Sequence, residues 1–264
     1  MIDELIENCL PMIRGLKKGR YAVTIGGSIG KGLSHSKSDV DFRLYADDFI
    51  DDMWGKGYEE AKKYIAYWAE RGIIIDGVWM RKIAEIDEPL NKWLAGDTEP
   101  EMLEWTVWGY YLPTDIYNQK IIEDPFGIAE DWKKRMEPYP EALKSALINK
   151  HINRLKYWKN DYHYKNKADR KDIVFLASLS ASLVHDMMQV LCALNGVYFP
   201  GDGHNLSVAG NFKFKPDEFE KRIESVLYPE SPDKLLSQYN AIIDLINDIE
   251  KTVNFSEIQD KIKL

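Results

Sequence analysis

Two aspartates separated by one residue open an apolar run, in the segment "SDVDFRLYA" at positions 38–46. Side chains alternate across a β-strand, so Asp39 and Asp41 are expected on one face and Val40 on the other, toward the core. Two carboxylates about 7 Å apart on one face repel each other unless a cation lies between them. A pair of Mg²⁺ ions would supply that charge, because Mg²⁺ prefers oxygen ligands and completes its coordination with phosphates.

An isolated Asp-x-Asp pair has a simpler explanation, because acids on an exposed edge strand discourage pairing with other chains. This pair is not isolated, since Gly26, Gly27 and Ser28 close the preceding apolar run, "YAVTI" at 21–25. Glycines let the backbone approach a phosphate, and the turn after them can present N–H groups and a hydroxyl to it. A tight turn without a ligand is the alternative interpretation of this segment.

Two common phosphate-binding motifs do not fit this turn. A P-loop requires G-x-x-x-x-G-K-[ST], whereas here Lys31 is followed by Gly32, and Ile25 stands where the first glycine is required. The dinucleotide fingerprint G-x-G-x-x-G fails as well. The sequence therefore argues against a P-loop NTPase and against a Rossmann dehydrogenase.

Gly-Ser after a strand, followed about ten residues later by Asp-x-Asp entering the next strand, resembles the signature of the DNA-polymerase-β-type nucleotidyltransferase superfamily. The expected order of strand, GGS loop, strand, helix and hairpin is also similar to its minimal catalytic domain. Antibiotic nucleotidyltransferases, which act on aminoglycosides and lincosamides, add a helical domain. The segments "YPEALKSALINKHI" and "ALNGVYFPGDGHN" resemble a group of such two-domain proteins.

The resemblance implies roles for five residues. Gly27 and Ser28 would hold the β- and γ-phosphates of ATP or another nucleoside triphosphate, and Asp39 and Asp41 would bind two Mg²⁺ ions. Lys31 would neutralise phosphate charge, unless it is an ordinary solvated loop lysine. A nucleoside monophosphate, expected to be AMP, would pass to a hydroxyl of a small, cationic, antibiotic-like acceptor. The alternatives are adenylylation of a protein Tyr, Ser or Thr, or a catalytically inactive module that binds a nucleotide or a partner.

The superfamily usually has a third carboxylate on a later strand. In "GIIIDGVWMRKIAEID", at 72–87, the candidates are Asp76, Glu85 and Asp87. Asp76-Gly77 is also a typical two-residue hairpin turn, and we predict a hairpin there. A hairpin would place the position expected to carry the acid near Arg81, and a cation there would not bind Mg²⁺. The third ligand is therefore left unassigned.

Two regions must position these groups. Apolar residues at helical spacing predict helices at 3–17 and 59–71, on either side of the strands expected at 21–25 and 39–46. This part of the chain therefore mixes helices and strands. From about residue 87 the sequence is mainly helical, apart from a short "KII" near 121. Helices are expected over 139–160, 171–195, 216–227, 231–250 and 255–262. We predict an α+β fold, with a nucleotidyltransferase-type mixed-sheet catalytic domain at 1–112 and an all-α, helical-bundle, substrate-binding domain at 113–264.

The helix expected at 171–195 carries one polar stripe on an otherwise apolar surface. The stripe consists of Lys171, Ser178, Ser182, His185 and Gln189. It is either exposed to solvent or the wall of a cleft, and His185 is either structural or a general base for an acceptor hydroxyl. The aromatic residues between 93 and 117 are either interdomain core or a wall that stacks a base or an acceptor ring.

Composition limits the partners. The chain has 264 residues, 45% of them hydrophobic, and a net charge of −8. The acidic balance argues against binding to long nucleic acids, because such binding depends on neutralising phosphates. No apolar run approaches the length of a membrane span, and the N-terminus "MIDELIENCL" is acidic, unlike a secretory signal. The only cysteines, Cys9 and Cys192, lack metal-type spacing, so a cytoplasmic setting is expected, with a small-molecule acceptor and no membrane partner.

Overall fold

The structure is a computed structural model that describes residues 2–35, 38–50 and 56–262. It divides into two compact units: unit 1 comprises residues 1–93 and 112–138, and unit 2 comprises residues 94–111 and 139–264. The chain thus passes between the units at 93/94, 111/112 and 138/139, whereas the sequence predicted a single boundary at 112/113. Segment 112–138 belongs to unit 1 because a strand within it pairs with the sheet.

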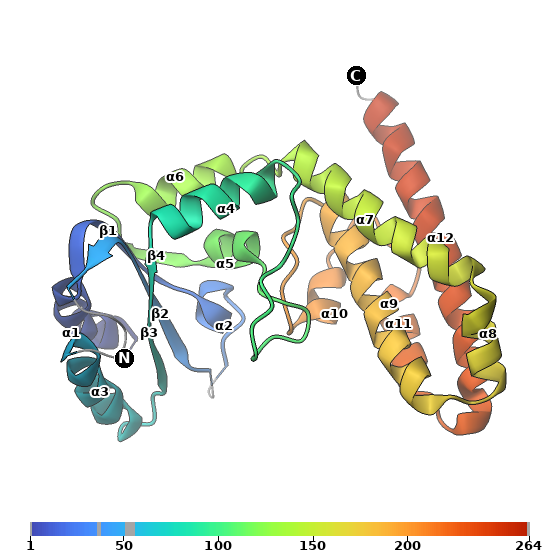
Figure 1. The fold of residues 1–264 in the computed structure, drawn as a ribbon, viewed down its shortest axis with the longest axis horizontal. Coiled ribbons are helices and arrows are strands. Elements are labelled where there is room, and N and C mark those ends of the chain that lie inside the picture. The colour runs from blue at the N-terminus through green and yellow to red at the C-terminus, as the bar shows by residue number, and fades with distance from the viewer. Residues whose placement is uncertain (1, 36–37, 51–55, 263–264) are drawn as a thin grey trace. The chain divides into compact units, whose positions relative to one another are not determined.

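Unit 1 is built on a four-stranded mixed sheet (Figure 1). Its strands are β1 (Lys17–Ile25), β2 (Val40–Phe49), β3 (Ile75–Lys82) and β4 (Lys120–Glu123), in the order β3-β2-β1-β4. β1 is antiparallel to both β2 and β4, and β2 is parallel to β3. A mixed sheet followed by a mostly helical region confirms the predicted α+β class.

The two faces of β2 have different neighbours, as the alternation of its side chains predicts. Val40, Phe42 and Leu44 join one core cluster with α1 (Ile2–Gly15) and with Trp68 of α3 (Lys56–Ala69). On the opposite face, Tyr45 meets Trp132 of α6 (Ile128–Arg135) edge to face, with ring centroids 4.9 Å apart. Asp41 and Arg43 have the same parity as Tyr45, so they lie on the α6 side of the sheet. The remaining helices of unit 1 are α2 (Gly27–Gly30), α4 (Ala84–Leu94) and α5 (Leu112–Asn118).

The predicted hairpin at Asp76-Gly77 is wrong. Both residues lie inside β3, which continues to Lys82 alongside β2. The parallel pairing with β2 determines the path of this segment, and that pairing is made with residues more than 30 positions away in the sequence. Asp76-Gly77 instead forms a bulge within β3.

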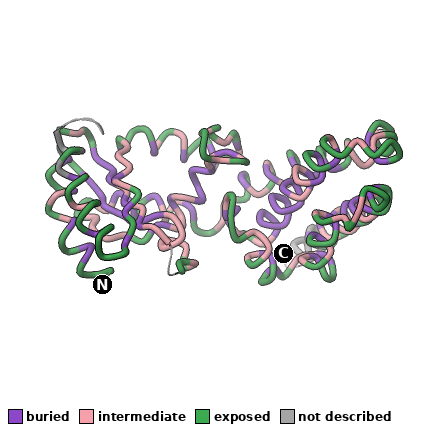
Figure 2. Tube along the Cα trace, turned by 90° about the horizontal axis from the view of Figure 1, so that it is seen from below, coloured by how far each residue is buried: buried purple, intermediate pink, exposed green. Residues whose placement is uncertain are grey.

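Unit 2 is helical. Its helices are α7 (Glu141–Asn160), α8 (Tyr162–Asp169), α9 (Ile173–Leu194), α10 (Asn205–Ala209), α11 (Phe219–Leu227) and α12 (Leu235–Ile262). The helices expected at 231–250 and 255–262 are one continuous helix, α12, preceded by a 3₁₀ turn at Pro232–Lys234. Figure 2 shows that each unit has its own buried interior with exposed residues around it.

α9 is the central helix of unit 2. It packs against α7, α8, α10, α11 and α12. By length and composition alone, α9 is apolar enough to cross a membrane, but 61% of its apolar window is buried within the protein. Such burial is typical of a core helix, so α9 gives no clear sign of a membrane protein. Among the described residues, no second helix meets the same test of length and composition.

Candidate functional site

Three carboxylates of unit 1 converge. Asp39, Asp41 and Asp76 each offer an oxygen, and these oxygens lie within 4.8 Å of one another. Asp39 directly precedes β2, Asp41 lies in it, and Asp76 belongs to β3. Asp39 and Asp41 are half-buried, and Asp76 is exposed. The structure therefore brings together the two predicted aspartates and adds one of the three candidates for the third carboxylate.

A bulge in β3 explains why Asp76 joins the pair. Val40 is registered with Ile75, and Asp41 with Gly77, so Asp76 is an extra residue with no counterpart in β2. An extra residue changes the direction of side chains locally, which brings Asp76 to the side of the sheet that carries Asp41. Gly77 has a φ of 119°, a backbone conformation that side chains with a Cβ rarely adopt.

The other candidates for the third ligand have different roles. Glu85 accepts a hydrogen bond of 3.0 Å from the backbone N–H of Lys82, at the start of α4. Asp87 accepts hydrogen bonds of 2.7 Å from both Trp132 Nε1 and Arg135 Nη2. Arg81 is registered with Tyr45, four residues along β3 from Gly77, and therefore does not take the position of Asp76.

The Gly-Gly-Ser turn lies directly against Asp41. The backbone N–H of Gly26 donates to the carbonyl oxygen of Asp41 over 2.9 Å. Gly27 has a φ of 58°, and a Cβ built on it would lie 1.7 Å from Asp41 Oδ2. Only glycine allows the turn and the carboxylate to approach so closely.

Ser28 and Lys31 lie at the two ends of α2. The Oγ of Ser28 is buried, and among the described residues it has no hydrogen-bond partner. The first N–H groups of a helix also lack acceptors within that helix. Lys31 is the C-cap of α2 and is half-buried. A buried hydroxyl and backbone N–H groups next to three carboxylates are suited to hold phosphate oxygens and a divalent cation together.

Arg43 and Asp115 are functional candidates that the sequence analysis missed. Arg43 Nη1 lies 3.7 Å from Asp41 Oδ1, and Arg43 Nε lies 3.4 Å from Asp115 Oδ2 in α5. The signal for Arg43 was the same two-residue alternation that links Asp39 to Asp41. Asp115 gave no local signal, because it reaches the site through the packing of α5.

A hydrogen-bonded chain fixes Asp115 behind the site. Gln119 Nε2 donates to Asp115 Oδ2 over 3.1 Å and to the Tyr45 hydroxyl over 2.6 Å. Thr24 Oγ1 in turn donates to Gln119 Oε1 over 2.6 Å. Since Thr24 and Tyr45 belong to β1 and β2, the position of Asp115 is coupled to the sheet.

The pKa of Asp41 reports the electrostatic state of the cluster. Burial raises this pKa above its usual range, and the Arg43 guanidinium opposes the rise. The carboxylates of Asp39, Asp76 and Asp115 raise it further. A cation placed among Asp39, Asp41 and Asp76 would therefore relieve both the repulsion and the cost of burying Asp41. The carboxylate oxygens of the cluster and the buried Ser28 hydroxyl fit Mg²⁺ together with a phosphate group.

Gly27→Ala should abolish divalent-ion binding, because the new Cβ would displace the Asp41 carboxylate. Gly32→Ala is the matched control: Gly32 also has a positive φ, of 68°, but a Cβ there would meet nothing within 4 Å. Each substitution should lower the free energy of unfolding by about 1–2 kcal/mol through backbone strain. Urea unfolding and Mn²⁺ titration would test this. Equal Mn²⁺ binding by the two variants would contradict the assignment of Gly27.

In unit 2, the polar stripe of α9 changes character along its length. Lys171 and Ser178 are exposed, Ser182 is half-buried, and His185 and Gln189 are buried. Of the aromatic residues between 93 and 117, Trp108 stacks on His185 with ring centroids 4.5 Å apart, whereas Trp105 is 72% exposed. The stripe therefore faces solvent at its start and the interior of unit 2 at its end.

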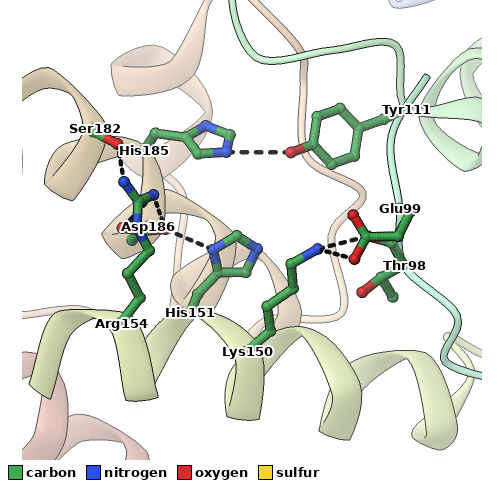
Figure 3. Close-up of polar contacts among 9 residues, drawn as sticks. All are labelled: Thr98, Glu99, Tyr111, Lys150, His151, Arg154, Ser182, His185 and Asp186. Carbon is green, nitrogen blue, oxygen red and sulfur yellow. Dashed lines mark hydrogen bonds and ion pairs between the residues drawn. The ribbon is translucent and has the colours of Figure 1, made fainter. Parts of the chain in front are cut away.

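His185 is a poor candidate for the general base. A hydrogen bond of 3.2 Å joins its Nε2 to the Tyr111 hydroxyl (Figure 3). Burial, with the nearby charges of His151, Arg154 and Lys150, lowers the pKa of His185 to about 3. The ring is therefore neutral near pH 7 and accepts a proton weakly. Its surroundings favour the structural interpretation.

Asp186 is the centre of a second polar network. It is fully buried, and it contacts His151 Nδ1 at 2.8 Å and Arg154 Nη1 at 3.0 Å. Arg154 Nη2 also donates to Ser182 Oγ over 2.6 Å. Figure 3 shows Asp186 of α9 between these two side chains of α7. A buried carboxylate requires such partners, so the network joins α7 to α9.

Asp186→Asn should lower the free energy of unfolding by about 2 kcal/mol, because it weakens the charge-assisted contacts that this fully buried carboxylate makes with His151 and Arg154. The matched control is Asp244→Asn, at an exposed position of α12, which should change it by less than about 0.5 kcal/mol. Urea unfolding followed by tryptophan fluorescence would compare the variants. Equal stabilities would show that the network contributes no net stabilisation.

The comparisons with known proteins concern the middle of the chain. A family model described as a domain of unknown function (DUF4037) matches residues 114–203, from α5 of unit 1 to a point beyond α9 of unit 2. The match excludes the Gly-Gly-Ser turn and the three converging aspartates. No curated protein matches the chain. The comparisons therefore assign no activity to the carboxylate cluster.

Proposed function

We propose that the protein is a nucleotidyltransferase whose chemistry resides in unit 1. It would transfer a nucleoside monophosphate, AMP when ATP is the donor, to a hydroxyl of a small-molecule acceptor. The observation that carries the proposal is the convergence of Asp39, Asp41 and Asp76 beside the Gly27-Ser28 turn. This combination supports the resemblance to the polymerase-β-type superfamily, which the sequence motif first indicated.

Each residue has a defined task in this proposal. Asp39 and Asp41 bind two Mg²⁺ ions, and Asp76 supplies the third carboxylate. Gly27 lets the backbone approach the triphosphate, the Ser28 hydroxyl donates to a phosphate oxygen, and Lys31 adds positive charge. Bound Mg²⁺ would activate the α-phosphate and neutralise the charge of the departing pyrophosphate.

The reaction exchanges one phosphorus–oxygen bond for another. The acceptor oxygen forms a bond to the α-phosphorus while the bond from the α-phosphorus to the bridging oxygen of the β-phosphate breaks. Pyrophosphate leaves with the electron pair of that bond, and the proton of the acceptor hydroxyl passes to a base or to water. In this step, Asp39, Asp41 and Asp76 would hold the Mg²⁺ ions and would form no covalent bond with the substrate.

The net charge, the helical unit and the two cysteines bear on the acceptor and the cellular setting. A net charge of −8 favours a cationic small molecule over a long nucleic acid. The helical unit 2 is the natural candidate for binding the acceptor, as in antibiotic nucleotidyltransferases. Cys9 and Cys192 are both buried free thiols, which is compatible with a reducing, cytoplasmic environment.

Mg²⁺ with ATP should raise the melting temperature of the protein, and the double substitution Asp39→Asn with Asp41→Asn should abolish the rise. Ligand at 100 times its Kd stabilises the native state by about 2.7 kcal/mol. Differential scanning fluorimetry with and without Mg²⁺ would measure the shift. An equal shift in the double variant would mean that the nucleotide binds away from these carboxylates.

Asp41→Ala and Asp76→Ala should each lower nucleotidyl transfer at least about a hundredfold, because each removes charge that holds the metal ions, a contribution of several kcal/mol. Asp48→Ala, at the exposed far end of β2, is the matched control and should retain activity. The assay is pyrophosphate release from ATP with a panel of aminoglycosides, lincosamides and candidate protein acceptors. Unchanged release in Asp41→Ala would refute its role, and release with proteins alone would indicate adenylylation of a protein.

A further inference from the structure

Arg43 is held in a fixed position beside the carboxylate cluster. Its side chain is only 12% exposed. Its guanidinium carbon lies 4.8 Å from the centre of the Trp79 ring, and its Nε lies 3.4 Å from Asp115 Oδ2. A Cβ added to Gly26 would lie 3.1 Å from Arg43 Nη2, so the Gly-Gly-Ser turn limits the guanidinium on a further side.

The contact between Arg43 and Asp41 is electrostatic without being a hydrogen bond. Their closest nitrogen and oxygen atoms are 3.7 Å apart, which exceeds hydrogen-bonding distance. Asp115 and Trp79 therefore hold the guanidinium slightly away from Asp41. The oxygens of Asp41 remain available to a metal ion, while the positive charge of Arg43 still acts on them.

This charge opposes the binding of a second cation. A divalent ion among Asp39, Asp41 and Asp76 would lie close to the guanidinium, in a part of the protein where partial burial strengthens electrostatic interactions. The carboxylate of Asp115 offsets part of the charge of Arg43. A bound triphosphate would offset more, because its negative charge enters the same site with the ion.

We propose that Arg43 is a fixed counter-charge that weakens the binding of free divalent ions to Asp39, Asp41 and Asp76, so that the ion is retained mainly together with an anionic ligand such as a nucleoside triphosphate. The inference rests on the proposed function and adds a mode of regulation to the same site. Arg43 acts here as a positioning residue that balances the charge of the carboxylates. Asp115 keeps the guanidinium of Arg43 at 3.7 Å from Asp41.

The test is the affinity of the full-length protein for Mn²⁺ without nucleotide, from the electron paramagnetic resonance signal of the free ion. Arg43→Met and Arg43→Gln remove the charge and retain much of the side-chain length, whereas Arg43→Lys retains the charge. Both neutral variants should bind Mn²⁺ at least about tenfold more tightly than the wild type. Arg43→Lys should resemble the wild type, and the difference should shrink at high ionic strength, because salt screens the charge.

Asp115→Asn provides a test that leaves Arg43 in place. Without the carboxylate that holds it, Arg43 should move onto Asp41, and Mn²⁺ binding should weaken at least about threefold. This variant keeps the proposal testable if the neutral Arg43 variants do not fold, which circular dichroism would reveal. Unchanged or tighter binding by folded Asp115→Asn would count against the proposal.

The outcomes separate this inference from the proposed function. Folded neutral variants that bind Mn²⁺ no more tightly than the wild type would overturn the role of Arg43, and lost binding would show that Arg43 only supports the structure. If the neutral variants bind more tightly but ATP does not increase Mn²⁺ binding to the wild type, after subtraction of the Mn²⁺ that ATP binds without protein, the counter-charge stands and the nucleotide-based function falls. Failure of the wild type and all the variants to bind Mn²⁺ would overturn both.

Discussion

The close approach of the Gly27 backbone to the Asp41 carboxylate is the constraint on which the site of unit 1 depends. A Cβ on Gly27 would overlap Asp41 Oδ2 at 1.7 Å, so the turn after β1 can lie against β2 only with glycine at this position. The hydrogen bond from Gly26 to the Asp41 carbonyl fixes the same contact through the backbone. Ser28 is thereby held beside the carboxylates, and the surroundings of its buried hydroxyl follow from the same packing.

The carboxylate cluster was predictable from the sequence only where it depends on local geometry. The two-residue alternation of a strand is local, and it correctly placed Asp39 and Asp41 together. Asp76-Gly77 favours a backbone irregularity, but a hairpin turn and a bulge use the same local preference. The parallel partner β2 decides between them, and that partner is remote in the sequence. Asp115 depends on remote packing in the same way.

Unit 2 follows the same division between local and remote determinants. Helical periodicity predicted α9 to within a few residues. The spacing of apolar residues that produces this periodicity is contained in the segment itself. The polar stripe on α9 could not be interpreted from its own sequence, since its burial depends on Trp108 and Tyr111 as well as on α7. Asp186 is tolerated at zero exposure because His151 and Arg154 reach it from that helix. The sequence of α9 alone contains neither His151 nor Arg154, so it could not show that Asp186 would be buried.

The buried carboxylates of the two units differ in how completely nearby cations compensate their charge, and this difference bears on function. Asp186 has a histidine and an arginine within 3.0 Å, so its charge is compensated by the protein itself. Asp41 has one guanidinium at 3.7 Å, and three other carboxylates raise its pKa. A folded protein gains no stability from such incomplete compensation, because the repulsion among Asp39, Asp41 and Asp76 opposes folding. Incomplete compensation is useful where a ligand supplies the missing positive charge, and for this reason the cluster of unit 1, rather than the network of unit 2, is the candidate for the chemistry.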